Sequence, residues 1–268
     1  MEFIADKQRK LSKLALYNFQ DLSYSALMKL LRNKDVKVNG VRIKEDVMLN
    51  VGDKVEIYYK PQKRSSITII YSDENVLVVN KKQGYTSEEV YQSAKESFTT
   101  AGFVHRLDRN TSGIMVFSLN TQAEVELLKG FKNHDFIKIY KATVYGKMPK
   151  KSDTLTAYLV KDSENSTVRI YDNKVKDSSL IKTGYEVEEE NGETSVLKVR
   201  LYTGKTHQIR AHLAHVGHFI IGDGKYGDNQ INKKFGKDKQ MLCAYELTFS
   251  FDQKSCLNYL NNKRFCIE

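Results

Sequence analysis

The residues best suited to chemistry are Asp108 and its flanking arginines, Arg106 and Arg109, in the string FVHRLDRNTSG at positions 103–113. A carboxylate can act as a nucleophile or stabilise a developing positive charge, and an adjacent cation favours its ionised form. The string is also rich in turn formers, so a plainer interpretation makes Asp108 a surface turn residue with solvated arginine neighbours. The rest of the chain has to decide between these two interpretations.

Two further stretches carry polar side chains on regular elements. IKIYKATVYG at 137–146 alternates as a strand with Tyr140 in its middle, although tyrosines are common in strands. In VLKVRLYTGKTHQIRAHLAHVG at 196–217, a strand should end at Tyr202, and a helix should span about His207–His215 before Gly217. The apolar run from Ile114 predicts a buried strand directly after the Asp108 loop.

The remaining pattern is rich in strands and poor in helices. ITIIYSDENVLVVN at 67–80 predicts two strands around a polar turn, and LCAYELTF at 242–249 predicts a closing strand. Residues 121–131 read as a helix with Val125, Leu127, Leu128 and Phe131. Residues 151–195 read as hairpins in which the acidic run Glu186–Glu190 faces solvent. No element is predicted for residues 85–100.

The strings match one family in order along the chain. HRLDRNTSG resembles the HRLD-x-x-TSG signature of the RluA-type pseudouridine synthases, which isomerise uridine to pseudouridine in folded RNA. IKIYKATVYG resembles the family's K-x-Y-x-A-x-V-x-G motif, and GKTHQIRAHL…GHFIIGDGKYG resembles its GRTHQIRVHL…GHPIIGDxxYG block. Together these blocks cover 67–251. The chain departs from the usual residues at Lys82, Lys205, Phe219 and Cys243.

The resemblance assigns roles to site residues. Asp108 becomes the catalytic carboxylate and Arg210 its ion-pair partner, while Tyr140 lies by the base and takes part in proton transfer from carbon. Ile209 packs on the uracil face, and Arg106 fills the gap left when the target uridine flips out of its stack. The resemblance further places three residues against the RNA substrate: His105, Lys205 and His207. The reaction needs no cofactor and no metal.

The N-terminal quarter resembles the S4 RNA-binding domain over about 11–59, through VKVNG and GDKVEI after two short helices, Lys10–Asn18 and Tyr24–Asn33. Ser23 can cap the second helix. Lys29 and Arg32 on that helix would meet RNA phosphates, although each taken alone could equally belong to a solvated helix face.

Composition fits an RNA partner. The formal net charge is +10, and the N-terminal quarter is more basic than the rest. The three cysteines form no CxxC pair, and no apolar run is long enough for a signal peptide or a membrane span. We therefore expect a cytoplasmic monomer that binds RNA, neither DNA nor a membrane, with ribosomal RNA as the first candidate and transfer RNA as the second.

Other interpretations remain open. The chain could be a catalytically silent RNA-binding or ribosome-assembly protein on the same scaffold, given the departures at Lys82, Phe219 and Cys243. It could also be a metal-dependent nuclease if the histidines at 207, 212, 215 and 218 held a metal, although no HExxH motif or cysteine partner accompanies them. GDGKYG at 222–227 has the dinucleotide-binding spacing, but no apolar helix pattern follows it, so we reject that function.

The predicted fold is α+β. Residues 1–60 form a small α/β S4-like domain, residues 61–66 a linker, and residues 67–268 a catalytic domain. The strand-rich order supports a sheet domain, and the mixed, mainly antiparallel topology is what the resemblance implies.

Overall fold

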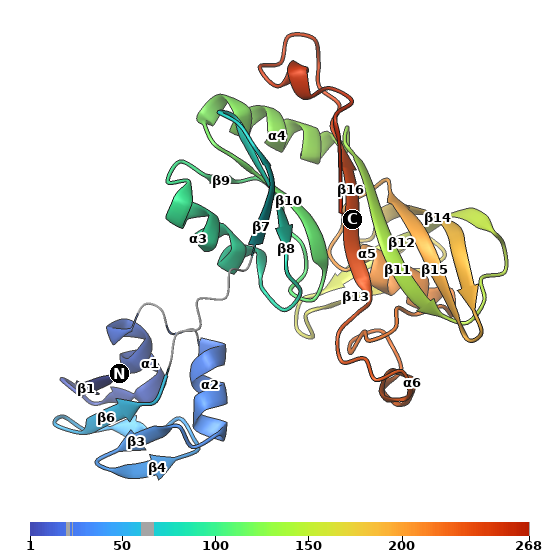
Figure 1. Cartoon of the computed structure of the whole chain (residues 1–268). Helices are drawn as coiled ribbons and strands as arrows, with labels where there is room; N and C mark the ends of the chain where they lie inside the picture. Colours follow the sequence, from blue (N-terminus) through green and yellow to red (C-terminus); the bar gives the residue numbers. More distant parts are fainter. Residues whose placement is uncertain (20–21, 23, 60–66, 268) are drawn as a thin grey trace. The chain divides into compact units, whose positions relative to one another are not determined.

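The computed structural model describes residues 1–19, 22, 24–59 and 67–267. The chain divides into two compact units, Met1–Arg64 and Ser65–Glu268 (Figure 1). The predicted Ser23 cap and the predicted linker at 61–66 lie outside the described residues. None of the described helices is long and apolar enough to cross a bilayer.

The first unit packs two short helices on small sheets. One sheet has the strand order β1-β6-β3-β4, and β2 pairs with β5. Both predicted helices are present, with Leu14, Leu27 and Leu31 among the buried core residues. Asn39 and Gly40 both have positive φ, which is the conformation of the hairpin turn predicted by the VKVNG string. The element bounds are β1 Glu2–Ile4, β2 Arg9–Lys10, α1 Leu11–Asn18, α2 Tyr24–Arg32, β3 Val36–Val38, β4 Val41–Ile43, β5 Met48–Leu49 and β6 Lys54–Ile57.

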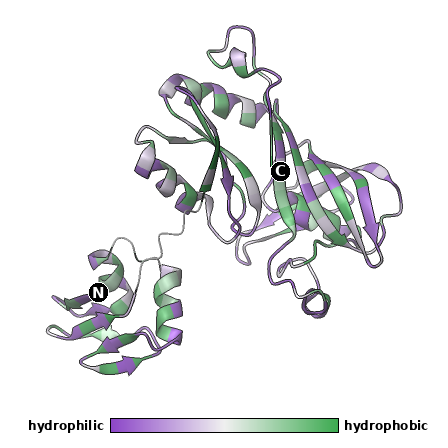
Figure 2. Ribbon diagram, in the orientation of Figure 1, coloured by the Kyte–Doolittle hydropathy of each residue, from purple (hydrophilic) through white to green (hydrophobic). Residues whose placement is uncertain are grey.

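The second unit is built on one large sheet. Its strand order is β13-β12-β14-β15-β11-β16-β10-β8-β7, with β17 on β16 and β9 on β10. All of these pairs are antiparallel except β10 with β16, so the predicted mixed, mainly antiparallel sheet is confirmed. The strands are β7 Ile67–Ser72, β8 Val76–Lys81, β9 Gly102–Phe103, β10 Ser112–Ser118, β11 Ile137–Tyr145, β12 Ser152–Asp162, β13 Thr167–Tyr171, β14 Ser179–Asn191, β15 Thr194–Leu201, β16 Leu242–Thr248 and β17 Arg264–Cys266. Hydrophobic and hydrophilic residues alternate along many of them (Figure 2).

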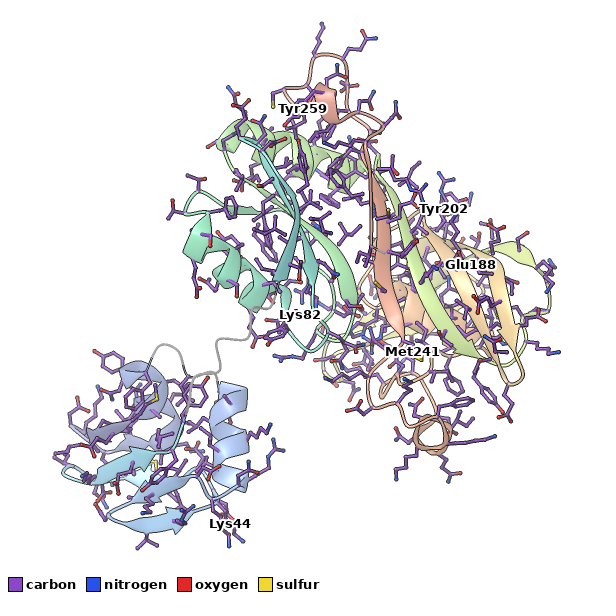
Figure 3. The ribbon with its side chains drawn as sticks, viewed as in Figure 1. Lys44, Lys82, Glu188, Tyr202, Met241 and Tyr259 are labelled. Atoms are coloured by element: carbon purple, nitrogen blue, oxygen red, sulfur yellow. The ribbon has the colours of Figure 1, made fainter. Side chains whose placement is uncertain are left out.

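Five helical segments accompany the sheet: α3 Ser87–Ser97, α4 Thr121–Asn133, α5 Gln208–His215, α6 Asn229–Lys234 and the 3-10 turn η1 Asn258–Leu260. The sequence analysis did not predict α3, although Thr86 and Glu89 form a reciprocal capping box at its start. Only part of the apolar set predicted for α4 is buried. Leu127 lies in the core, whereas Val125 and Leu128 are exposed. The four glutamates of the acidic run on β14 are exposed as predicted, and Glu188 pairs with Lys141 (Figure 3).

The one parallel pairing of the large sheet brings the central string to the middle of the sheet. Ser112 and Gly113 at the start of β10 lie opposite Cys243 and Ala244 of β16. Gly113 has φ +119°, and a Cβ there would lie 2.3 Å from the Ala244 carbonyl oxygen. A glycine is therefore required where the Asp108 loop enters the sheet.

Candidate active site

Buried polar contacts fix the loop that carries Asp108. The Ser87 hydroxyl, at the start of α3, accepts a hydrogen bond from the Leu107 N–H and donates one to the Leu107 carbonyl. The fully buried Lys81 ammonium donates to the carbonyls of Tyr85 and Arg109, at 2.6 Å and 3.0 Å. The loop is thus held from both sides, so the position of Asp108 does not depend on solvent-exposed contacts.

Asp108 is one end of a chain of ion pairs. Arg210 on α5 donates from Nη1 to Asp108 Oδ2 at 2.8 Å, which confirms the predicted pair, and from Nε and Nη2 to Asp223 at 2.7 Å and 3.0 Å. Burial works against the charged guanidinium, but the two carboxylates outweigh it, so the pKa of Arg210 is raised. Burial alone would raise the pKa of Asp223; its bonds to Arg210 and to two backbone N–H groups lower it instead.

A second polar chain approaches Asp108 through His207. The Val168 N–H donates to the Tyr226 hydroxyl, which in turn lies 2.9 Å from His207 Nδ1. In the tautomer protonated on Nε2, Tyr226 donates to Nδ1 and the imidazole N–H lies 3.7 Å from Asp108 Oδ2. Burial lowers the pKa of His207, and Arg210 adds to the effect against the pull of Asp108. A neutral imidazole thus presents its N–H toward the carboxylate.

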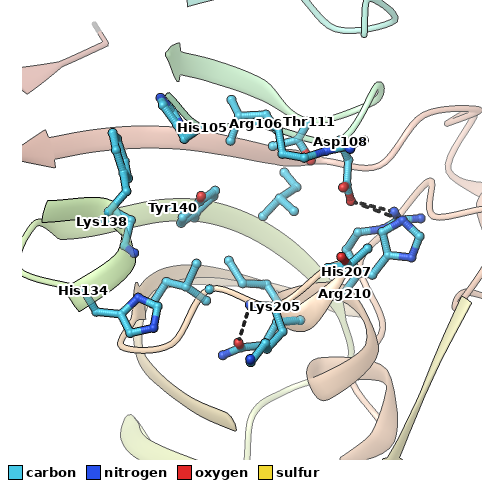
Figure 4. A pocket seen from close by; sticks show the side chains of 18 residues that line it. His105, Arg106, Asp108, Thr111, His134, Lys138, Tyr140, Lys205, His207 and Arg210 are labelled. Atoms are coloured by element: carbon cyan, nitrogen blue, oxygen red, sulfur yellow. Dashed lines mark hydrogen bonds and ion pairs between the residues drawn. The ribbon is translucent and has the colours of Figure 1, made fainter. Parts of the chain in front are cut away.

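Asp108 opens onto a cavity of about 320 Å³, within the size range of ligand sites. Tyr140 from β11, Ile209 from α5 and Leu107 from the loop supply an apolar lining. The Tyr140 hydroxyl has no hydrogen-bond partner within the described part of the chain, and burial together with the charge of Asp108 raises the pKa of Tyr140. Figure 4 shows Tyr140 between Asp108 and the far end of the cavity, so a flat ring bound there would meet the tyrosine and the carboxylate together.

The other predicted substrate residues also line this cavity, with different environments. The His105 ring stacks on Phe131 at 4.2 Å, its Nε2 accepts from the Val116 N–H, and burial lowers the pKa of His105 to about 3. Arg106 is exposed at the rim and lies 3.8 Å from Glu88. The Arg106 guanidinium is therefore available to a ligand at the rim.

The remaining predicted RNA-binding residues lie at the rim of the cavity or outside it. Lys205 is exposed at the rim, whereas Lys29 and Arg32 are exposed on α2 of the first unit. The clustered histidines have separate partners: His212 contacts Thr183, His215 contacts Asp172 and His218 contacts the Tyr145 carbonyl. The described residues hold no group of three or more His, Cys, Asp or Glu that could bind a metal ion.

Three of the four departures from the family pattern, those at Lys82, Phe219 and Cys243, lie outside the cavity. Phe219 stacks on Tyr145 with ring centroids 5.4 Å apart. Lys82 is exposed after β8 (Figure 3). Burial raises the pKa of Cys243, which lies opposite Ser112 and Lys141 in the sheet. None of the three belongs to the residues that line the cavity.

Sequence reasoning missed four residues that support the site: Lys81, Lys138, Asp223 and Tyr226. Asp223 and Tyr226 belong to the GDGKYG string, to which the sequence analysis assigned no site residue. Its position in the third matched block was the available signal. Lys138 lies two residues before Tyr140 in the strand motif, so the alternation of the strand could have placed both on one face.

Comparisons with known proteins agree with the geometry. The family model described as RNA pseudouridylate synthase matches residues 75–215. An uncharacterized RNA pseudouridine synthase of Aquifex aeolicus is 32% identical and covers 93% of this chain and 88% of its own. The ribosomal large subunit pseudouridine synthase C of Vibrio parahaemolyticus is 28% identical, over 86% of this chain and 81% of its own. Among solved structures, human RNA pseudouridylate synthase domain containing 1 has the same fold, with a TM-score of 0.66, 24% identity, and coverage of 78% and 86%. The chain therefore belongs to the RNA pseudouridylate synthase family, and the RluA-type membership and isomerase activity predicted from its HRLDRNTSG string are confirmed.

Proposed function

We propose that this enzyme converts specific uridines of large-subunit ribosomal RNA to pseudouridine, with Asp108 as the catalytic carboxylate. The observation that carries the proposal is the ion-pair chain from Asp108 through Arg210 to Asp223, at 2.8 Å and 2.7 Å. It holds a carboxylate in one position at the mouth of an otherwise mainly apolar cavity. Such a carboxylate can attack the substrate or balance positive charge as the N1–C1′ bond breaks.

Other residues of the cavity hold the uracil, transfer its proton and replace it in the RNA stack. Ile209 and Tyr140 pack on the uracil ring while it is detached and turns to present C5 to the ribose. The C5 proton must then leave. Because its pKa is raised, Tyr140 is a neutral phenol in the free enzyme and not a standing tyrosinate base. It can therefore take up the C5 proton only while its own hydroxyl proton passes to a second base, either water in the cavity or the Asp108 carboxylate. Arg106, exposed at the rim, is placed to occupy the stack that the flipped base leaves.

The choice of ribosomal RNA is supported by the similarity to a relative named for the ribosomal large subunit. The basic net charge favours a large polyanion, and exposed Lys29 and Arg32 on α2 suit the S4-like role of contacting phosphates. We propose transfer RNA as the second substrate class to be tested.

The test measures tritium release from unmodified large-subunit ribosomal RNA labelled with [5-³H]uridine. Wild type should release tritium, whereas Asp108→Asn should lose roughly 10⁴-fold in kcat and still retain RNA in a filter-binding assay. Asp252→Asn is the matched control, because Asp252 forms an exposed ion pair with Lys129 and neither residue lines the cavity. Full activity of Asp108→Asn would refute the catalytic assignment. Release from transfer RNA alone would refute only the ribosomal target.

A further inference from the structure

The cavity has a basic end that the reaction as described leaves unused. His134, Lys138 and Lys205 line it, and Figure 4 shows His134 and Lys138 across Tyr140 from Asp108 and Arg210. Within the described part of the chain, none of these three side chains has an ion pair or a hydrogen bond. Asp108 is the only carboxylate among the lining residues, and it is already engaged by Arg210.

The environment of Lys138 gives the strongest indication that an anionic ligand binds here. It is half-buried on β11, two residues before Tyr140, and therefore on the same face of the strand. Burial lowers the pKa of Lys138, with no carboxylate to oppose the effect. An ammonium removed from water without a counter-charge destabilises the folded chain, so such a group is typical of a site completed by an anionic ligand.

His134, whose side chain lies near Gly204 as that of Lys138 does, has an unfavourable backbone conformation. It is the C-cap of α4 at φ 63° and ψ 31°, a left-handed position at which glycine or asparagine is preferred. Burial and the charges of Lys138 and Lys205 lower the pKa of His134. A strained, non-glycine residue that lines a cavity is the pattern expected where the side chain has a function.

His134 and Lys138 come from different elements and both lie close to Gly204. A Cβ built on Gly204 would lie 3.6 Å from His134 Cε1 and 3.8 Å from Lys138 Nζ, and Lys205 is the next residue in the chain. The end of α4, the strand β11 and the loop before α5 thus surround one point. The absence of a side chain at Gly204 leaves this point open to a ligand.

We propose that His134, Lys138 and Lys205 form a binding site for a backbone phosphate of the substrate RNA, next to the flipped uridine. The inference rests on the proposed function. A flipped nucleotide carries its base into the cavity, but its two phosphates remain in the strand and must lie at the rim. The phosphodiester is the anion that RNA brings there, and mixed lysine and histidine donors suit its oxygens.

The first experiment measures binding without turnover. The whole chain is titrated with uridine 5′-monophosphate, uridine 3′-monophosphate and uridine, and the pKa of His134 is followed by NMR through its Cε1 proton, assigned with His134→Asn. A bound phosphate should raise the pKa of His134, whereas uridine should not, and Lys138→Gln should abolish the rise. The nucleotide that acts shows which phosphate is bound. Equal effects of nucleotides and uridine, or no effect up to the solubility limit, would overturn the proposal whether or not ribosomal RNA is the target.

The second experiment compares Lys138→Gln with Lys161→Gln, a control that removes an exposed lysine of β12 outside the cavity lining. With an RNA that the enzyme modifies, Lys138→Gln should lower kcat/KM about tenfold, chiefly through KM, as for the loss of a charged hydrogen bond. The slope of log affinity against log salt should become shallower by about 0.7, the value of one single-strand phosphate contact.

A loss confined to kcat with an unchanged salt slope would mean that Lys138 acts on the uracil instead. Behaviour equal to that of Lys161→Gln would also refute the site. The melting temperature of Lys138→Gln, at or above that of wild type, checks that the variant is folded.

Discussion

Replacing Asp223 by asparagine should remove the support of the catalytic pair without touching the substrate. Asp223 is 1% exposed, and its carboxylate accepts four hydrogen bonds, from Arg210 Nε and Nη2 and from the Lys225 and Tyr226 N–H groups. An asparagine has a single acceptor oxygen, and its amide group would face a donor. The variant therefore leaves a buried guanidinium with one carboxylate, Asp108, in place of two.

The size of the effect follows from the geometry. Breaking a buried ion pair costs about 3–5 kcal/mol, and the lower figure applies because Arg210 keeps its 2.8 Å bond to Asp108. For a unit of this length, 1 kcal/mol corresponds to roughly 2–4 °C, so the melting temperature should fall by about 6–12 °C. Loss of the clamp also frees Arg210 to move, and a displacement on the order of 1 Å at the reacting groups costs about 10²-fold in kcat.

Calorimetry and tritium release at 20 °C, on protein whose near-ultraviolet circular dichroism shows native packing, would measure both quantities. The control Asp252→Asn removes an ion pair in which the Asp252 side chain is 76% and the Lys129 side chain 54% exposed, so the melting temperature and kcat should both stay close to those of wild type. If Asp223→Asn behaves like this control in both assays, the clamp does not support catalysis and the reasoning fails.

Two further predictions concern residues around the loop. Because burial lowers the pKa of His105 to about 3, its neutral ring contributes stability above pH 6.5 that is lost as the pH falls from 6.5 toward 3, about 2 kcal/mol of it by pH 5. Urea unfolding between pH 7 and pH 5 should show this loss, and His105→Gln, which keeps an acceptor for the Val116 N–H, should flatten the slope; an unaltered slope would contradict the assignment. Gly113→Ala should cost about 3 kcal/mol or more, because its Cβ meets the Ala244 backbone at 2.3 Å. Gly192→Ala, also at positive φ but with open space around it, should cost only about 1–2 kcal/mol, and equal losses in the two variants would refute the collision.

Features that depend on near neighbours along the chain could be predicted from residue patterns alone. The turn at Asn39–Gly40, the helices α1 and α2, and the apolar strand β10 after the Asp108 loop all follow from local residue patterns. The ordered motifs also indicated the family. Helix α3 was within reach of the same reasoning, because its capping box occupies only 86–89, but Val90 and Ala94 are the only buried apolar side chains along it.

Which side chains lie together in the site depends on the tertiary structure. Asp108 and Arg210 are 102 residues apart, and Asp223, which fixes Arg210, lies in a string with no marked periodicity. The convergence of His134 and Lys138 at Gly204 depends on the end of α4, on β11 and on the loop before α5 reaching one point. Local periodicity reports which face of an element is buried, but not which distant element covers it. The parallel pairing of β10 with β16, together with the contacts between distant elements, supplies that information and makes one cavity from separate motifs.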